Sequence, residues 1–209
     1  MMFRESHKTE LKINFEQSIV YLKIRRILEI FIIILCMPII SILFIFISLL
    51  VLIDSKGKII YKQKRIGKKE KKFFIYKFQT LKNNEGDYGI GNKKNQNLSK
   101  FSSFLRNHRL DELPQILNVI KGDLNLIGPR PEIEEEYKKY KNEIEGYGLR
   151  KLIPQGITGL AQVNQPHSDT TDGNRIKLEY DLFYIQNVSF FLDIKIIIKT
   201  IVYIFRGRL

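Results

Sequence analysis

Residues 30–53, IFIIILCMPIISILFIFISLLVLI, form a run of 24 residues without a charged side chain. A helix needs about 20 mostly apolar residues to cross a bilayer, so this run is long enough to span one. It exceeds the usual apolar length of a secretory signal, starts late and lacks a small-residue cleavage site. We therefore expect it to stay in the mature protein as a membrane-embedded helix.

Pro38 interrupts this apolar run. Its ring lacks the backbone donor for the carbonyl of Ile34 and crowds that carbonyl, which kinks or breaks a helix. At about 1.5 Å per residue, the apolar pieces on either side cover roughly 12 and 24 Å, and neither alone crosses a hydrocarbon core of about 30 Å. Pro38 therefore favours a re-entrant hairpin that enters and leaves the membrane on one face. A single-pass helix with a proline kink is the alternative.

Basic side chains flank the run at both ends. They are Lys23, Arg25 and Arg26 before it, and Lys56, Lys58, Lys62, Lys64 and Arg65 after it. Because basic residues mark the cytoplasmic side of a membrane, both flanks favour the cytoplasm. This agrees with the re-entrant hairpin and places the rest of the chain in the cytoplasm.

The positive charge is concentrated in the middle of the chain. The 209 residues carry a formal net charge of +13, of which +11 lies in residues 54–130. Such an excess indicates a localised anionic partner, such as phosphate, nucleotide, nucleic acid or an acidic membrane surface, and a solvated lysine-rich face is the alternative. With 44% hydrophobic residues the chain is too apolar for a disordered tail, and a single cysteine, Cys36, excludes an internal disulfide.

Patterns after the membrane run predict a short hairpin followed by a loop. Residues 59–67 and 71–81 interleave β-branched and aromatic residues with lysines on either side of a polar turn, which is typical of a β-hairpin. Residues 83–100 are polar and rich in Asn and Gly, which predicts a long loop.

Three helices are expected in the second half of the chain. Residues 110–119 predict a helix with Asp111 as a candidate N-cap, and residues 132–145 predict one with an acidic first turn whose glutamates face solvent. Residues 190–205 are apolar with interspersed charges, too short and too charged to span a bilayer. They predict an interfacial helix in the headgroup layer, with a core helix as the alternative.

Asp111 and Glu112 form the first candidate site for chemistry. A probable helix start favours negative charge and keeps a carboxylate ionised, and an ionised carboxylate can attack phosphorus to give an acyl phosphate. A neighbouring carboxylate can hold Mg²⁺ together with substrate phosphates. Simple N-capping is the alternative role for the pair.

Further cations could meet a diphosphate at this pair. Arg130 stands between two prolines in residues 128–131, GPRP, so its planar guanidinium is pre-aimed in the way that suits phosphate oxygens. A rigid surface turn is the alternative. Arg106 and Lys77 are two more candidate phosphate-binding cations.

The run RLDELPQILNVIKGDLNLIGPRPE, residues 109–132, resembles the signature of the bacterial sugar transferase family, the membrane-bound phosphoglycosyl transferases. Other pieces match in the same order, at residues 25–29, 61–67, 76–81, 156–164 and 180–200. The resemblance covers about residues 20–206. The short chain with one apolar run is similar to the small monotopic branch of the family.

This resemblance implies a helix-rich α+β fold. It includes a re-entrant membrane helix broken at Pro38, a small β-hairpin, and a cytoplasmic catalytic domain that rests on the membrane through interfacial amphipathic helices. We accordingly expect an N-terminal extension over residues 1–22, a membrane-embedded helix-break-helix over residues 23–53 and the catalytic domain over residues 54–209. The expected location is the bacterial cytoplasmic membrane, with the catalytic domain facing the cytoplasm.

The reaction implied is transfer of a sugar-1-phosphate from a UDP-sugar to undecaprenyl or another polyprenyl phosphate, releasing UMP, as the first membrane step of glycan assembly. By the same resemblance, Asp111 attacks the β-phosphorus and forms a covalent phosphosugar intermediate. The resemblance also implies that Glu112 would bind Mg²⁺, and that Arg106 and Arg130 would neutralise phosphate charge. Metal and cations lower the repulsion between an anionic nucleophile and an anionic diphosphate.

Three residues depart from the family pattern. Met37 stands before Pro38 where a serine is usual, Gln79 replaces a usual Arg or Lys, and Leu160 replaces a frequent Trp. The loss of one cation at Gln79 leaves open a catalytically silent scaffold, although Asp111, Glu112, Arg106 and Arg130 are all intact. A nucleic-acid-binding module that uses the aromatic residues of the hairpin among its lysines would leave residues 109–132 unexplained, so we expect no nucleic-acid partner.

Overall fold

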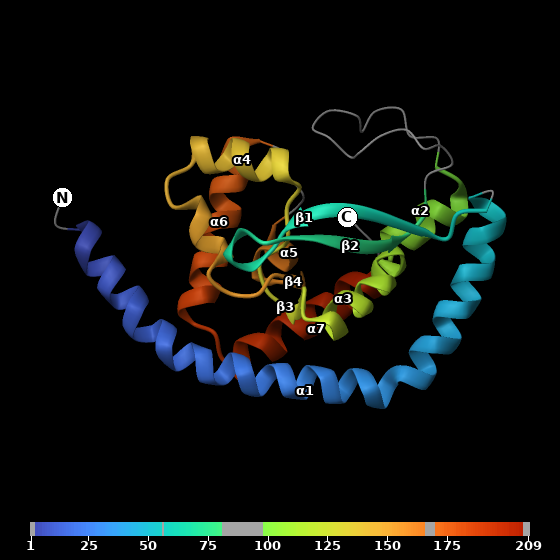
Figure 1. Cartoon of the computed structure of the whole chain (residues 1–209), viewed down its shortest axis with the longest axis horizontal. Helices are drawn as coiled ribbons and strands as arrows, with labels where there is room; N and C mark the ends of the chain where they lie inside the picture. Colours follow the sequence, from blue (N-terminus) through green and yellow to red (C-terminus); the bar gives the residue numbers. More distant parts are fainter. Residues whose placement is uncertain (1–2, 56, 81–97, 166–169, 207–209) are drawn as a thin grey trace.

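The computed structural model describes residues 3–55, 57–80, 98–165 and 170–206, with the side chains of the first helix from Ile19 onward. The described chain is rich in helices and carries two small two-stranded sheets, which agrees with the predicted helix-rich α+β class. Figure 1 shows one long helix curving around the other elements. Of the predicted loop over residues 83–100, residues 83–97 lie outside the described part.

The long helix α1 spans Phe3–Asp54 and contains Pro38. Ile19–Asp54 within it is long and apolar enough to cross a membrane. The predicted break at Pro38 is wrong, because α1 is one continuous helix that bends within its apolar run (Figure 1). A proline removes one backbone hydrogen bond, and the intact turns on either side carry the helix past that gap.

One side of α1 packs against the rest of the chain, and the other side is exposed. Ile33 is buried in a cluster with residues of β2 and α3, and Ile47 is buried with Phe78 and Leu105. On the other side, Leu35 and Ile53 keep 70% and 79% of their surface exposed. The helix therefore fastens to the domain by one stripe and presents a long apolar surface outward.

The predicted hairpin is confirmed. Strands β1 (Ile60–Ile66) and β2 (Lys72–Phe78) pair antiparallel around the short 3-10 turn η1 (Lys68–Glu70). Alternation along the strands places Arg65 on the same face as Lys77, because Tyr61 lies opposite Lys77 and Arg65 opposite Phe73.

Helix α2 (Lys100–Asn107) begins inside the stretch predicted as a loop, so that prediction is wrong at its end. Ser99 accepts a hydrogen bond of 2.9 Å from the backbone nitrogen of Ser102 and caps the helix. A serine that caps the first turn stabilises a helix start even after a polar stretch.

The helix predicted over residues 110–119 consists of a 3-10 turn, η3 (Leu110–Gln115), followed by α3 (Ile116–Lys121). Asp111 is not its N-cap. Arg109 holds that position in the left-handed conformation, with φ 55°, and Asp111 lies within the first turn. Left-handed backbone at a non-glycine residue is costly and persists where the surroundings enforce it, often at functional sites.

The second half of the chain adds a short parallel sheet and more helices. Strands β3 (Asn125–Ile127) and β4 (Gly156–Thr158) form the sheet. The helices are α4 (Glu134–Glu143), the 3-10 turn η4 (Tyr147–Lys151), α5 (Leu160–Asn164), α6 (Thr171–Gln186) and α7 (Phe190–Arg206). Helix α4 confirms the prediction for residues 132–145. One glutamate of that stretch departs from it, because Glu132 is buried in an ion pair with Arg150 instead of facing solvent.

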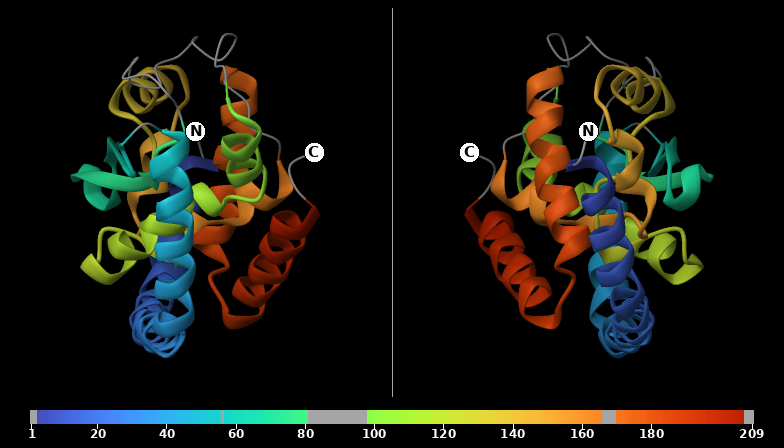
Figure 2. Two further views of the ribbon diagram at one scale, coloured as in Figure 1. Left: turned by 90° about the vertical axis from the view of Figure 1, so that its right-hand side faces the viewer. Right: turned by 90° about the vertical axis from the view of Figure 1, so that its left-hand side faces the viewer.

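Helix α7 lies at the surface. Figure 2 shows it slanting down toward the level of α1. Ile196 is fully buried in the main core cluster, whereas Phe191 and Phe205 are 84% and 82% exposed. The alternative of a core helix is therefore wrong, and the exposed apolar side suits the predicted interfacial helix.

Candidate active site

Asp111 and Glu112 lie in η3, packed beside strand β2. Their exposed fractions are only 9% and 8%. The buried side chain of Asn118, in the helix α3 that directly follows η3, binds the backbone of β2. Its amide donates to the Phe74 carbonyl (2.7 Å), and its oxygen accepts from the Tyr76 backbone nitrogen (3.1 Å). These bonds satisfy the outer edge of β2 and hold the carboxylates against the hairpin.

Glu112 is the centre of a cluster of charges. Its Oε1 accepts from Lys77 Nζ at 2.7 Å and from Arg130 Nη2 at 3.0 Å. Three segments separated in sequence, β2, η3 and the GPRP turn, thus meet at one carboxylate. The structure brings together Lys77, Glu112 and Arg130, which the sequence had singled out separately.

The backbone around Gly128 explains why Arg130 points there. Gly128 N donates to the Thr158 carbonyl (2.8 Å), and Gly156 N donates to the Pro129 carbonyl (3.0 Å). A Cβ atom on Gly128 would lie 2.4 Å from the Pro154 carbonyl oxygen, a distance that real contacts do not reach. Only glycine allows this close approach of two backbones, and the approach fixes the turn that carries Arg130.

The two adjacent carboxylates have opposite pKa shifts. Burial, together with the charge of Glu112, raises the pKa of Asp111 above its ordinary value. Burial alone would also raise the pKa of Glu112, but Lys77 and Arg130 hold it well below its usual range. The expected effect of the helix start is not the largest influence on Asp111, because burial shifts its pKa in the opposite direction. A carboxylate with a raised pKa is the more basic and hence the better nucleophile of the pair.

Arg106 and Pro38 are not the partners of Glu112 in its two ion pairs with Lys77 and Arg130. Arg106, in α2, donates from Nε to Thr80 Oγ1 at 2.8 Å, and its charge favours the ionised form of Asp111. It therefore belongs to the surroundings of the Asp111 carboxylate. Pro38 is exposed on α1 and contributes to the fold of the membrane helix.

The carboxylate pair fits a magnesium ion. Glu112 Oε2 is buried and has no hydrogen-bond partner within the described part of the chain. Groups of three or more His, Cys, Asp or Glu residues that could hold a metal are absent from the described residues. Mg²⁺ is commonly held by one or two carboxylates together with waters and substrate phosphates, so the free oxygen of Glu112 beside Asp111 suits it.

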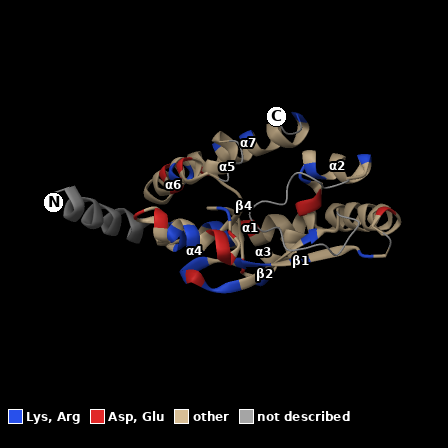
Figure 3. Ribbon diagram, turned by 90° about the horizontal axis from the view of Figure 1, so that it is seen from above, with Lys and Arg blue, Asp and Glu red and all other residues tan. Residues whose placement is uncertain are grey.

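Arg65 is a site residue that the sequence reasoning missed. It lies on the Lys77 face of the hairpin, and its Nη1 donates to the Pro131 carbonyl at 3.4 Å. Burial and the charge of Arg130 lower its pKa to about 10. The alternation of β1 could have revealed it, because Tyr61, Gln63 and Arg65 share one face of the strand, and Tyr61 lies opposite Lys77. Figure 3 shows blue Lys and Arg segments along the hairpin.

A buried ionic network supports the GPRP turn from behind. Arg150 is 1% exposed and pairs with Glu132 and with Asp181, the latter at 2.7 Å. Lys151 Nζ lies 3.4 Å from Glu132 Oε2 and donates to the Ile66 carbonyl. Burial alone would raise the pKa of Glu132, but Arg150 and Lys151 lower it to about 2. Through Asp181 and Ile66, the network connects α6 and the hairpin to Glu132, the residue that follows the GPRP turn.

Comparison with known proteins identifies the family. A model described as bacterial sugar transferase matches residues 20–207, nearly the whole chain. This chain belongs to the bacterial sugar transferase family. The family expected from residues 109–132 is thereby confirmed.

Individual sugar transferases are similar over most of this chain. The UDP-N-acetylgalactosamine-undecaprenyl-phosphate N-acetylgalactosaminephosphotransferase of Aeromonas hydrophila is 36% identical over 91% of this chain and 45% of its own length. The UDP-glucose:undecaprenyl-phosphate glucose-1-phosphate transferase of Klebsiella pneumoniae is 39% identical over 70% of this chain and 32% of its own length. The uncharacterized sugar transferase EpsL of Bacillus subtilis is 35% identical over 77% of each chain. This sugar transferase thus spans less than half the length of the first two relatives.

Proposed function

We propose that this sugar transferase moves a sugar-1-phosphate from a UDP-sugar to undecaprenyl or another polyprenyl phosphate and releases UMP. The observation that carries the proposal is the carboxylate pair Asp111 and Glu112, buried in a cluster of cations that includes Lys77 and Arg130. The names of the two longer relatives, both undecaprenyl-phosphate sugar phosphotransferases, support the same chemistry. The product would start assembly of a glycan such as a capsule, an O-antigen, an exopolysaccharide or a protein glycan.

The proposed reaction has two displacements at phosphorus. An Asp111 carboxylate oxygen attacks the β-phosphorus of the UDP-sugar and forms a P–O bond to the enzyme. The bond between that phosphorus and the bridging oxygen breaks, and UMP leaves with the electron pair. A phosphate oxygen of the polyprenyl phosphate then attacks the same phosphorus, which returns Asp111 to its carboxylate form and leaves a polyprenyl diphosphate sugar.

Surrounding residues provide the positive charge for these steps. Arg130 and Lys77 approach from the side of Glu112, while Arg106 favours the ionised form of Asp111. Fixed cations aimed at the charge that develops on the transferring phosphoryl group supply most of the catalysis in such reactions. Glu112, with Asp111 beside it, would hold Mg²⁺, which neutralises diphosphate charge when bound.

We also propose a re-entrant membrane topology. The bend of α1 within its apolar run and the exposed apolar sides of α1 and α7 support it (Figures 1 and 2). The residues proposed for the reaction all lie within residues 54–209, which would face the cytoplasm of the bacterium from its inner membrane. Strong labelling of a cysteine placed near residue 10, from outside intact cells, would contradict this topology.

The decisive experiment measures UMP release by the full-length protein in nanodiscs containing undecaprenyl phosphate, across a panel of UDP-sugars. We expect release with one sugar donor, abolished in Asp111→Asn, because the amide keeps the shape and removes the nucleophile. A variant that keeps more than a small fraction of the turnover would exclude Asp111 as the nucleophile. If no donor supports release, failure to trap a phosphosugar on Asp111 would favour a catalytically silent scaffold.

A further inference from the structure

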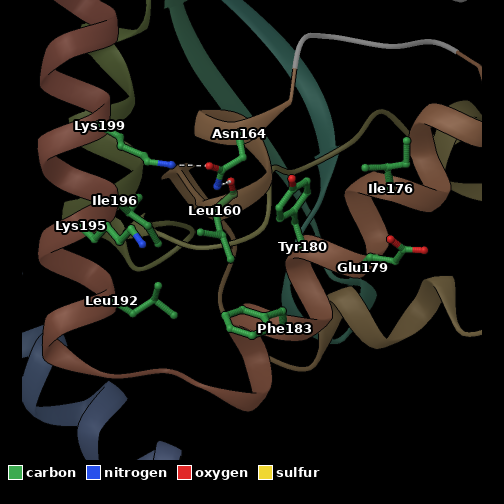
Figure 4. A pocket seen from close by; sticks show the side chains of 10 residues that line it. All are labelled: Leu160, Asn164, Ile176, Glu179, Tyr180, Phe183, Leu192, Lys195, Ile196 and Lys199. Carbon is green, nitrogen blue, oxygen red and sulfur yellow. Dashed lines mark hydrogen bonds between the residues drawn. The ribbon is translucent and has the colours of Figure 1, made fainter.

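A groove of about 500 Å³ lies between α5, α6 and α7. Its wall includes none of the residues of the Glu112 cluster. The volume falls within the range of small-molecule sites, about 300–1,000 Å³. Figure 4 shows the lining side chains converging from three helices, with α7 on one side and α6 on the other.

The groove changes from apolar to polar along its length. Phe183 and Leu192 lie at one end, Leu160 forms part of the floor, and Asn164 with Lys199 lies at the opposite end (Figure 4). Lys195 lies one helical turn before Lys199 on the same wall. This order matches a molecule with an apolar chain and a polar head.

Uncompensated positive charge lines the α7 wall. Lys195 makes no ion pair with any residue that the structure describes, and Lys199 donates to the neutral side-chain oxygen of Asn164. The carboxylate that lines the groove, that of Glu179, is exposed and belongs to α6 on the opposite side (Figure 4). The α7 wall is therefore complementary to an anion that lies against it.

The apolar end of the groove continues into the surface that we place in the membrane. Phe190 and Phe191, just before Leu192, are 57% and 84% exposed. The first turn of α7 is fastened to α1, because Tyr21 donates to Asp193 Oδ2 at 2.7 Å. A chain lying on Phe183 and Leu192 would thus leave the groove toward the bilayer.

We propose that this groove binds one anionic phospholipid. Its phosphate would contact Lys195 and Lys199, and the adjoining part of one acyl chain would lie against Phe183, Leu192 and Leu160. The groove is too small for a whole two-chain lipid, so the remainder would stay in the membrane. Such a lipid would fix α7 at the interface and fill an apolar groove that would otherwise hold water.

The test uses native mass spectrometry of the full-length protein in neutral detergent, titrated with phosphatidylglycerol, phosphatidylcholine or inorganic phosphate. We expect one retained phosphatidylglycerol, with an apparent Kd raised about tenfold or more in the double variant Lys195→Gln/Lys199→Gln, because two charge-assisted hydrogen bonds to the phosphate are lost. The control double variant Lys23→Gln/Lys100→Gln removes two exposed lysines outside the groove and should bind like the wild type. Phe183→Ser should also weaken retention, because it removes an apolar contact of the acyl chain. Phe183 is 53% exposed, so we expect the fold to tolerate this change.

Three outcomes would overturn the proposal. Equal retention of phosphatidylcholine would mean that the lysines do not recognise an anionic headgroup. Displacement of phosphatidylglycerol by inorganic phosphate alone would show a site for a free anion. Equal weakening in the control double variant would show a general electrostatic attraction of the lipid to the basic protein, without a specific site. Melting temperatures of all variants check folding, and the measurement requires no turnover, so it is independent of the proposed reaction.

Discussion

Lys77 Nζ lies 2.7 Å from Glu112 Oε1, although the two residues are 35 positions apart in the chain. Burial lowers the pKa of Lys77, while Lys77 in turn helps to hold the pKa of Glu112 low. The pair therefore keeps one of the two adjacent carboxylates charged, and that charge contributes to the raised pKa of its neighbour Asp111. The hairpin is thus part of the chemical site as well as of the fold.

Removing the Lys77 charge should impair turnover. In Lys77→Met we expect kcat for UMP release to fall about 10²-fold, as when one electrostatic donor is deleted from an active site. The matched control is Lys62→Met, an exposed lysine on the other face of the same hairpin. Steady-state UMP release checks both variants. Equal losses of kcat in the two would mean that Lys77 acts only through the overall positive charge of the hairpin and has no specific role in the site.

Arg65 should bind the phosphates of the nucleotide. It is a partly buried cation whose pKa the charge of Arg130 helps to lower, and an anionic ligand would relieve the repulsion between the two guanidinium groups. We expect Arg65→Gln to raise the Kd for UMP about tenfold, measured by calorimetry. Lys64→Gln, the exposed neighbour on the opposite face of β1, should leave that Kd unchanged. A lowered melting temperature with an unaltered Kd would indicate a purely structural role for Arg65.

Activity should fall on the acid side because of Asp111. Only the ionised carboxylate attacks phosphorus, and burial raises the pKa of Asp111 above its ordinary value of about 3.9. Activity should therefore decrease as the pH falls through this raised pKa, in a range where ordinary aspartates are still ionised. The pH profile of single-turnover UMP release measures this limb. In Arg106→Gln, which loses a charge that favours ionised Asp111, the limb should move to higher pH; an unmoved limb would mean that another group controls it.

Local patterns in the sequence predicted the hairpin, α4 and α7. Alternation and helical periodicity depend on neighbours within a few residues, and those patterns survive in the folded chain. Asp111, Glu112 and Arg130 could also be identified as candidate site residues from the sequence, because one motif, residues 109–132, contains all three. The start of α2 was missed at Ser99, where a serine cap before a short helix was the available signal.

Contacts between segments that are distant in the chain could not be predicted from the sequence. The sequence gives no local sign that Arg150 pairs with both Glu132 and Asp181, because the three residues belong to different elements. The bend of α1 was predicted as a break for a similar reason. Ile33 before Pro38 and Ile47 after it each pack against the domain, and these distant contacts hold both halves of the helix in place.

Gly128→Ala should destabilise the protein strongly. A Cβ atom there would lie 2.4 Å from the Pro154 oxygen and 2.9 Å from Gly156 N, and both are backbone atoms that cannot move aside cheaply. We expect a loss of about 1–3 kcal/mol or more in the free energy of unfolding, with reduced activity through displacement of Arg130. Gly148→Ala is the control, because a Cβ there meets its nearest atom at an ordinary 3.4 Å. Thermal unfolding in detergent compares the two, and equal melting temperatures would contradict the close approach of the two backbones.

The Glu132 carboxylate should stabilise the fold in a pH-dependent way. Arg150 and Lys151 lower its pKa to about 2, against about 4.3 in an unfolded chain. The unfolded state therefore binds the proton more readily, and the stability contributed by this group is fully present above about pH 4.3 and lost as the pH falls through about 2.

We expect Glu132→Gln to unfold at a lower temperature than the wild type at pH 7, because it leaves Arg150 with less compensating charge in a buried site. The difference should shrink steadily between pH 5 and pH 3, in melting curves recorded side by side. Glu135→Gln, which changes an exposed glutamate of α4, should show no such trend. A difference for Glu132→Gln that stays constant with pH would mean that the side chain acts through packing alone.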